Sequence, residues 1–199
     1  MTTNIDERDI INIVIVGRGG QGAVTACEII AEAAYLSGNF VDVHAYPSFG
    51  AERRGAPIQA FAKLSKKEKI WDRSQIDNPD IIIILDETVL NQSLSSSLKD
   101  NGILIINTDK EPEFFFDKFN LSRNIHIIVA DINKLALEKG LTIDGMPVVN
   151  TAILGALSKS LTELNLDNLY KVVQKRMSEK LAQLNIELIE EGYNLAKIL

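Results

Sequence analysis

Residues 10–22 read IINIVIVGRGGQG, and this stretch decides the fold class. Its β-branched first half is typical of a strand buried on both faces of a parallel sheet. The glycine-rich turn over 17–22 follows at once, and the alanine-rich stretch over 23–36 predicts a helix. A second strand is predicted over 40–46. We therefore expect a strand–helix–strand unit with a right-handed crossover.

The rest of the chain alternates between short apolar runs and helical stretches. Further strands are predicted over 58–64, 81–85, 103–106 and 125–129. Helices are predicted over 86–98, 131–139, 150–160 and 166–199, the last with a break near Asn185. We expect one α/β domain over 1–199, Rossmann-like and doubly wound, with a mostly parallel sheet. Residues 1–9 are predicted to be a flexible N-terminus and 150–199 a helical C-terminal part.

Two details of the C-terminal part are also predicted. Asn150 or Thr151 is expected to cap the helix over 150–160. The helical stretch after it carries one apolar stripe, which predicts a face packed on the core, with docking of a partner helix as the alternative. The residues of this stripe are Leu169, Val173, Met177, Leu181, Leu184 and Leu188.

The composition is that of an ordinary globular protein. Of the 199 residues, 46% are hydrophobic and 24% are charged, which excludes a disordered chain. The formal net charge of −6 disfavours nucleic acid as a partner, because phosphate backbones repel an acidic chain. One cysteine, Cys27, excludes an iron–sulfur cluster held by this chain alone, and with two histidines no metal site is expected.

From the start of the sequence and its apolar runs we expect no signal peptide and no membrane-spanning helix. The first residues are polar and acidic, unlike a signal peptide, and the longest apolar runs have the length of a strand. We therefore expect a cytoplasmic protein without a membrane contact. Cys27 lies inside the first predicted helix, where a small packing residue is a better interpretation than a nucleophile.

The glycine turn fits the pattern G-x-G-x-x-G through Gly17, Gly19 and Gly22. It follows a strand and opens a helix, where a turn of this kind lets the backbone approach a phosphate at the helix N-terminus. A tight turn without a ligand is the alternative. A nicotinamide site also needs an acid at the end of the second strand, but Asp42 lies near the start of that strand. NAD(P) is therefore disfavoured.

A second segment of chemical interest, YPSFGAERRGAP over 46–57, leaves the carboxyl end of the second strand. In open α/β sheets this edge carries the ligand crevice, so the segment is expected beside the glycine turn. Arg53 and Arg54 suit a phosphate or carboxylate ligand because each guanidinium offers a planar fork of donors. An ion-pair network at a subunit interface, with Glu52 as a partner, explains the same residues equally well.

The sequence also resembles a known family. GRGGQGAVTACEIIAEAA over 17–34, followed by YPSFGAERRGAPIQAFAKLS over 46–65, is similar to the gamma subunit of the 2-oxoacid:ferredoxin oxidoreductases. NPDIIIILDETVL over 78–90 and VVNTAILGAL over 148–157 share this resemblance, which covers about residues 11–160. The form ERRGAP is most similar to the pyruvate and 2-ketoisovalerate branch.

The resemblance implies one subunit of a larger oxidoreductase. Such enzymes decarboxylate a 2-oxoacid on thiamine diphosphate, send electrons through iron–sulfur clusters to ferredoxin, and transfer the acyl group to coenzyme A. The implied partners are alpha, beta and delta subunits, which are expected to carry the thiamine diphosphate, its Mg²⁺ and the clusters. This chain is expected to help bind coenzyme A, to hold the complex together, and to be inactive alone.

No catalytic residue and no metal ligand is expected in this chain. The residues expected to bind the coenzyme are Gly17, Arg18, Gly19, Gly20, Gln21, Gly22, Ser48, Arg53, Arg54 and Gly55. Two alternatives remain at this point: a structural subunit without a ligand, and a stand-alone NAD(P)-linked oxidoreductase.

Overall fold

A mixed β-sheet forms the centre of the molecule. The structure is a computed structural model that describes residues 4–48, 54–143 and 145–199. Within these residues the main sheet has seven strands in the order β2-β3-β1-β4-β5-β6-β9, and two short strands form a separate hairpin. The main strands are β1 (Ile10–Arg18), β2 (Asp42–Pro47), β3 (Pro57–Ser65), β4 (Ile81–Ile84), β5 (Ile103–Asn107), β6 (His126–Ala130) and β9 (Lys197–Ile198), and the hairpin strands are β7 (Thr142–Ile143) and β8 (Met146–Pro147).

The strand directions confirm the predicted α/β class with a mostly parallel sheet. β1, β4, β5 and β6 pair in parallel. β3 pairs antiparallel with both β1 and β2. β1 and β2 therefore run in the same direction, as the predicted strand–helix–strand unit requires, but β3 lies between them. The last strand, β9, pairs antiparallel with β6.

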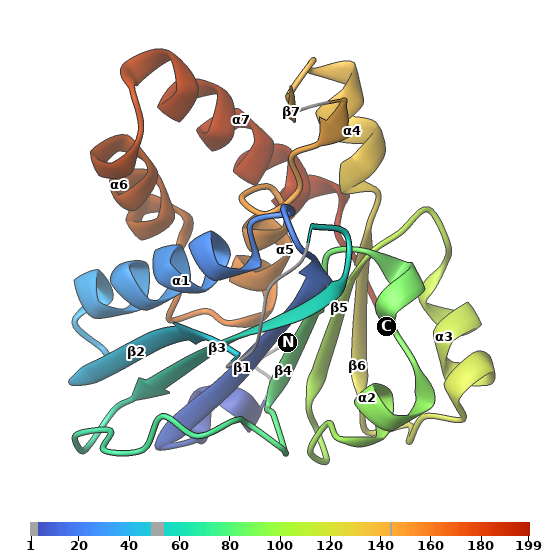
Figure 1. Cartoon of the computed structure of the whole chain (residues 1–199). Helices are drawn as coiled ribbons and strands as arrows, with labels where there is room; N and C mark the ends of the chain where they lie inside the picture. The colour runs from blue at the N-terminus through green and yellow to red at the C-terminus, as the bar shows by residue number, and fades with distance from the viewer. Residues whose placement is uncertain (1–3, 49–53, 144) are drawn as a thin grey trace.

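Helices cover both faces of the sheet, so the fold is doubly wound (Figure 1). Successive residues of a strand point to opposite faces, which gives the sheet two separate cores. Ile13 and Ile15 belong to the core on the first face, whereas Val14, Val16 and Phe115 belong to the core on the second. On the first face, α1 (Ala23–Ser37) and α5 (Ile153–Ser160) pack against the sheet. α6 (Leu166–Arg176) and α7 (Glu179–Leu195) pack on these two helices, and α4 (Ile132–Glu138) contacts α7. The second face packs against α2 (Gln92–Ser96) and α3 (Pro112–Phe119).

The prediction of one helix over 86–98 is wrong. A 3-10 helix, Glu87–Val89, and α2 take its place. Asp86 accepts a hydrogen bond from the backbone N–H of Thr88, and Asn91 accepts one from Leu94, so each side chain caps a short helix of its own. Because each cap begins a new helix, the segment over 86–98 forms two short helices and not one.

Two boundaries in the C-terminal part also differ from the prediction. α5 begins at Ile153, and neither Asn150 nor Thr151 caps it, because both side chains bond elsewhere. The stretch over 166–199 is divided between α6 and α7 rather than at Asn185, and its last residues form β9. Asn185 lies inside α7, where its Nδ2 donates to the carbonyl oxygen of Leu181 at 2.8 Å.

The segment over 4–9 is packed, whereas a flexible N-terminus was predicted over 1–9. Asn4–Glu7 form a 3-10 helix, Ile5 is fully buried, and Arg8 forms an ion pair with the buried Asp80. Residues 1–3 lie outside the described part of the chain. None of the helices in the described ranges combines the length and the apolar content needed to cross a membrane.

Candidate functional site

The turn after β1 requires glycine for two reasons, backbone conformation at some positions and close packing at another. Gly20 has φ of +99° and Gly22 has φ of +78°, a region that other residues rarely adopt. Gly17 is a packing position: a Cβ atom there would lie 3.1 Å from Cβ of Leu85. Gln21 closes the turn, because its Oε1 accepts the backbone N–H of Arg18 at 2.7 Å. The turn is held by its own side chain as well as by its glycines.

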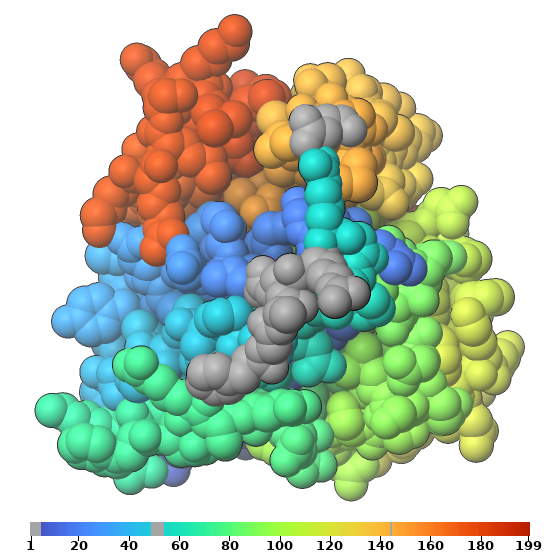
Figure 2. All heavy atoms as spheres, in the orientation of Figure 1, coloured from blue at the N-terminus to red at the C-terminus, as the bar shows by residue number. Residues whose placement is uncertain are grey.

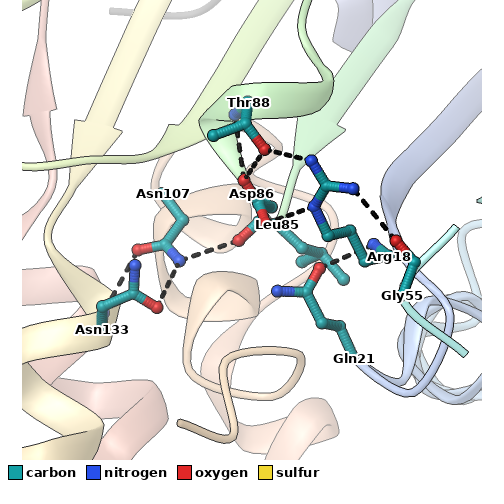
Figure 3. A network of polar contacts seen from close by, with 8 residues as sticks. All are labelled: Arg18, Gln21, Gly55, Leu85, Asp86, Thr88, Asn107 and Asn133. Atoms are coloured by element: carbon teal, nitrogen blue, oxygen red, sulfur yellow. Dashed lines mark hydrogen bonds and ion pairs between the residues drawn. The ribbon is translucent and has the colours of Figure 1, made fainter. Parts of the chain in front are cut away.

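Arg18 links three parts of the chain (Figure 3). Its Nε donates to Oδ2 of Asp86 at 3.0 Å, and its Nη1 donates to the carbonyl oxygen of Gly55 at 3.0 Å. Its Nη2 donates to Oγ1 of Thr88 at 2.6 Å. Arg18 was expected to contact the coenzyme, but the structure uses its guanidinium to fasten the end of β1 to the end of β4.

This link joins the carboxyl ends of β1 and β4, where a doubly wound fold binds dinucleotides. The strand order reverses between β1 and β4, and nucleotides bind at such a switch point. Burial alone would raise the pKa of Asp86, but the hydrogen bonds from Thr88 and Arg18 outweigh it and hold this pKa below its ordinary value. The side chain is therefore a carboxylate paired with Arg18. Asp42, the acid considered for a nicotinamide site, lies at the first residue of β2, where its side chain accepts the backbone N–H of Ile70.

The segment over 46–57, called here the arginine segment, was predicted to lie beside the glycine turn. Its described residues from Arg54 onward do so. The backbone N–H of Gly19 donates to the carbonyl oxygen of Ala56 at 2.9 Å, and that of Gly55 donates to the carbonyl oxygen of Gly19 at 3.0 Å. Gly19 and Arg54 form an isolated parallel bridge. These backbone contacts bring Arg54 to the turn from a position 35 residues later in the chain.

Of the other predicted site residues, Ser48 lies away from the turn. Arg53 and its neighbours over 49–53 lie outside the described residues. Ser48 lines a groove on the second face of the sheet, with Val16 and Val89 among its neighbours. Its backbone N–H donates to the carbonyl oxygen of Gln59 at 2.9 Å.

The N-terminus of α1 opens on a pocket of about 510 Å³, called here the glycine-turn pocket. In Figure 2 a narrow projection of the teal part of the chain rises between the orange-red C-terminal helices and the yellow-orange segment that carries α4 and the hairpin. α1 has no side-chain cap, so its first N–H groups keep the free donors of a helix N-terminus. The lining residues are Gly20, Gln21, Gly22, Thr25, Arg54, Leu141, Thr142, Ile143, Met146, Pro147, Val148, Asn150, Thr151, Met177, Leu181 and Asn185.

A second pocket, of about 540 Å³, lies at the carboxyl ends of β4, β5 and β6. It shares Gln21, Met146 and Pro147 with the glycine-turn pocket, so the hairpin stands between the two. Its walls carry four acidic side chains, whereas the lining residues described for the glycine-turn pocket include Arg54 and no carboxylate. The four acidic residues are Asp86, Glu87, Asp109 and Asp131. An anionic ligand is therefore favoured in the glycine-turn pocket and repelled from the acidic one.

The floor of the glycine-turn pocket uses residues that the sequence did not identify as a site. Asn150 Nδ2 donates to the carbonyl oxygen of Gly22 at 3.3 Å, and Thr151 Oγ1 donates to Oδ1 of Asn185 at 2.5 Å. The available signal is the pair Asn150-Thr151 at the start of the helix predicted over 150–160, where either residue is interpreted as a cap. Leu181, predicted to be core, is 42% exposed and lines the pocket mouth.

Comparison with known proteins agrees with this architecture. The family description "pyruvate ferredoxin/flavodoxin oxidoreductase" matches residues 12–195. The chain belongs to this family. The expectation of a 2-oxoacid oxidoreductase subunit, drawn from the sequence motifs, is thereby confirmed, and a stand-alone NAD(P)-linked enzyme is not supported.

Relatives in this oxidoreductase family cover nearly the whole chain. The pyruvate/ketoisovalerate oxidoreductases common subunit gamma of Pyrococcus furiosus is 37% identical, over 95% of this chain and 98% of the relative. The crystal structure of the pyruvate oxidoreductase subunit PORC of Thermotoga maritima matches with a TM-score of 0.80 and 32% identity, over 96% of this chain and 99% of that one.

A larger enzyme shares the fold. The 2-oxoglutarate:ferredoxin oxidoreductase of Magnetococcus marinus, solved with 2-oxoglutarate, coenzyme A and succinyl-CoA bound, matches with a TM-score of 0.70. Its identity is 19%, and the match covers 94% of this chain but 31% of that chain. At this identity the likeness concerns the fold alone.

Proposed function

We propose that this chain is the gamma subunit of a pyruvate-type 2-oxoacid:ferredoxin oxidoreductase, and that its glycine-turn pocket binds the diphosphate of coenzyme A. The observation that carries the proposal is the uncapped N-terminus of α1, which opens on this pocket beside Arg54. Free N–H groups and the helix dipole attract phosphate at such a position. Gly20, which carries no side chain and is exposed, leaves the backbone accessible to the phosphate oxygens.

The shape of the site favours coenzyme A over a nicotinamide dinucleotide. The β1–β4 crevice that would hold a dinucleotide is crossed by the contacts of Arg18 with Asp86 and Thr88. The lining of the glycine-turn pocket combines polar groups with apolar side chains, Ile143 and Met146 among them. A diphosphate that carries a long, partly aliphatic arm fits such a lining.

We also propose that alpha, beta and delta subunits complete the enzyme and that they hold the thiamine diphosphate, its Mg²⁺ and the iron–sulfur clusters. The support is chemical: one cysteine, fully buried, cannot hold a cluster. The gamma subunits among the relatives are named as parts of such oxidoreductases. Ferredoxin would be the electron acceptor of the complex rather than of this chain.

The test is Arg54→Ala in the assembled oxidoreductase. The KM for coenzyme A is expected to rise about tenfold, the value of one charge-assisted contact to a partly exposed phosphate, while kcat changes little. The decarboxylation half-reaction, measured without coenzyme A, is expected to keep its rate. Arg123→Ala is the control, because Arg123 lies over the ring of Phe116 on the other face of the sheet.

The same variant separates binding from assembly. A complex that stays intact with a raised KM supports the proposed site. Dissociation of the variant complex, seen by gel filtration, with an unchanged KM in the fraction that remains assembled, assigns the arginine segment to a subunit interface instead.

A further inference from the structure

Asn150 occupies an unusual place in the glycine-turn pocket. Its side chain lines the pocket but is only 8% exposed. It packs so closely on the start of α1 that a Cβ atom at Gly22 would lie 2.4 Å from Nδ2. The carbonyl oxygen of Gly22 can only accept a hydrogen bond, so the contact at 3.3 Å fixes which end of the amide is nitrogen. The oxygen, Oδ1, therefore has a defined position beside the helix N-terminus.

This oxygen has no hydrogen-bond partner among the residues that the structure describes. Oδ1 of Asn150 is buried and unpaired, although the neighbouring polar side chains of the pocket floor, Thr151 and Asn185, bond to each other. Proteins rarely leave a buried acceptor unpaired, because the missing bond costs free energy. An amide held in place by one atom, with its other polar atom unused, is arranged to receive a donor.

We infer that Oδ1 of Asn150 accepts a hydrogen bond from a hydroxyl group of the bound ligand, next to the diphosphate. This inference rests on the proposed function. The phosphate oxygens at the α1 N-terminus are acceptors and cannot satisfy Oδ1, so the donor has to come from the ester groups that flank them. Coenzyme A has a hydroxyl on each side, the ribose 2′-hydroxyl and the pantoyl hydroxyl. Asn150 thus selects a hydroxyl-bearing diphosphate ester over bare diphosphate.

The protein-side test is Asn150→Leu, which keeps the side-chain volume and removes both polar atoms. Dissociation constants for coenzyme A and for inorganic pyrophosphate, used as a competitor, are measured on the assembled oxidoreductase by calorimetry. Coenzyme A is expected to bind about tenfold more weakly to the variant, and pyrophosphate within about twofold of wild type. Thr151→Val removes another hydrogen bond from the pocket floor and is expected to leave the ratio of the two constants unchanged.

The ligand-side test does not depend on how the variant folds. Wild-type enzyme is titrated with coenzyme A lacking the ribose 2′-hydroxyl and with coenzyme A lacking the pantoyl hydroxyl. One of the two analogues is expected to bind about tenfold more weakly, and Asn150→Leu is expected to bind that analogue and the parent coenzyme equally.

Two outcomes overturn the inference, and a third overturns the proposed diphosphate site on which it rests. If Asn150→Leu weakens the binding of coenzyme A and of pyrophosphate equally, Asn150 acts only by holding Gly22 in place. If the wild-type enzyme binds both analogues as tightly as coenzyme A, neither hydroxyl group contacts Asn150. If the wild-type enzyme binds coenzyme A but pyrophosphate does not compete, or if it binds neither, the proposed diphosphate site itself falls, which is a separate result.

Discussion

The two arginines at the glycine turn, Arg18 and Arg54, differ in what they contact. Arg18 belongs to the glycine turn and Arg54 to the Arg53-Arg54 pair, and both were predicted to bind the coenzyme. The structure gives them different tasks, because Arg18 donates to Asp86, Thr88 and Gly55, whereas Arg54 lines the pocket. Arg18 therefore supports the site by holding the turn and the arginine segment together.

Replacing Arg18 by methionine tests this supporting role through its pH dependence. The pKa of Asp86 is lower in the folded chain than its ordinary value, so the link stabilises the protein above about pH 4 and is lost as the pH falls through the folded pKa. Arg18→Met is expected to lower the free energy of unfolding by about 1 kcal/mol at pH 7, because Arg18 is partly exposed. The deficit is expected to shrink below pH 4, as measured by urea unfolding.

The control for Arg18→Met is Lys67→Met. Lys67 pairs with Asp9 at 2.8 Å, but both side chains are well exposed, and such pairs contribute about 0.5 kcal/mol or less. A deficit for Arg18→Met that equals this control, or that is the same at pH 3 and pH 7, would contradict the role given to the link with Asp86.

The residues of the site were predictable only where the signal is local in sequence. Gly17, Gly19 and Gly22 form a pattern within six residues that follows a strand and precedes a helix. Asn150 contacts Gly22 across 128 positions, and its pattern is that of a helix cap. A single sequence carries no information on which distant segment a side chain meets, so Asn150 was assigned the more common local role.

At the scale of elements, the packing of α5 on α7 depends on two glycines that face the opposite helix. A Cβ atom at Gly155 would lie 2.0 Å from the carbonyl oxygen of Ile189, and one at Gly192 would lie 2.1 Å from that of Ala152. The helices approach so closely that each backbone occupies the space of the other's side chain. This contact holds the C-terminal helices over the core and places Leu181 and Asn185 at the pocket.

Gly155→Ala is expected to destabilise the protein by more than about 2 kcal/mol, although alanine favours an isolated helix by about 1 kcal/mol. The two backbones cannot give way as a flexible side chain would, so the helices have to move apart. Thermal unfolding measured by circular dichroism gives the size of the effect. Gly140→Ala is the control, because Gly140 has φ of +68° and open space around its Cβ position, so it reports backbone strain alone. A smaller loss at Gly155 than at Gly140 would contradict the close approach.

The existence of the helices was easier to predict than their ends. The apolar stripe over 166–199 has the period of a helix, but it does not show that α6 ends and α7 begins near Met177 and Ser178. Tertiary contacts favour this break, because α6 packs on α1 whereas α7 packs on α5. The capped segments after β4 were missed for the opposite reason: Asp86 and Asn91 are local caps hidden within a weak helical pattern.

At the scale of the whole molecule, the sequence predicted the layers better than the strand order. Apolar runs such as Ile81–Ile84 are buried on both faces, which only a central strand of a covered sheet requires. The alternation over 58–64 identified β3 as a strand, but a period of two does not specify a pairing partner or a direction. The insertion of β3 between β1 and β2 is therefore a property of the assembled sheet.

Purified alone, the chain is expected to be colourless and inactive in 2-oxoacid oxidation. Cys27 is its one cysteine, and burial together with the nearby charge of Glu28 raises the pKa of its thiol, which disfavours the thiolate that iron binds. The measurement is iron content and visible absorbance of the chain alone, compared with the chain purified together with its partner subunits. Iron and ferredoxin reduction are expected only in the complex. Stoichiometric iron in the isolated chain would mean that redox chemistry resides in this subunit, and the division of tasks proposed above would then be wrong.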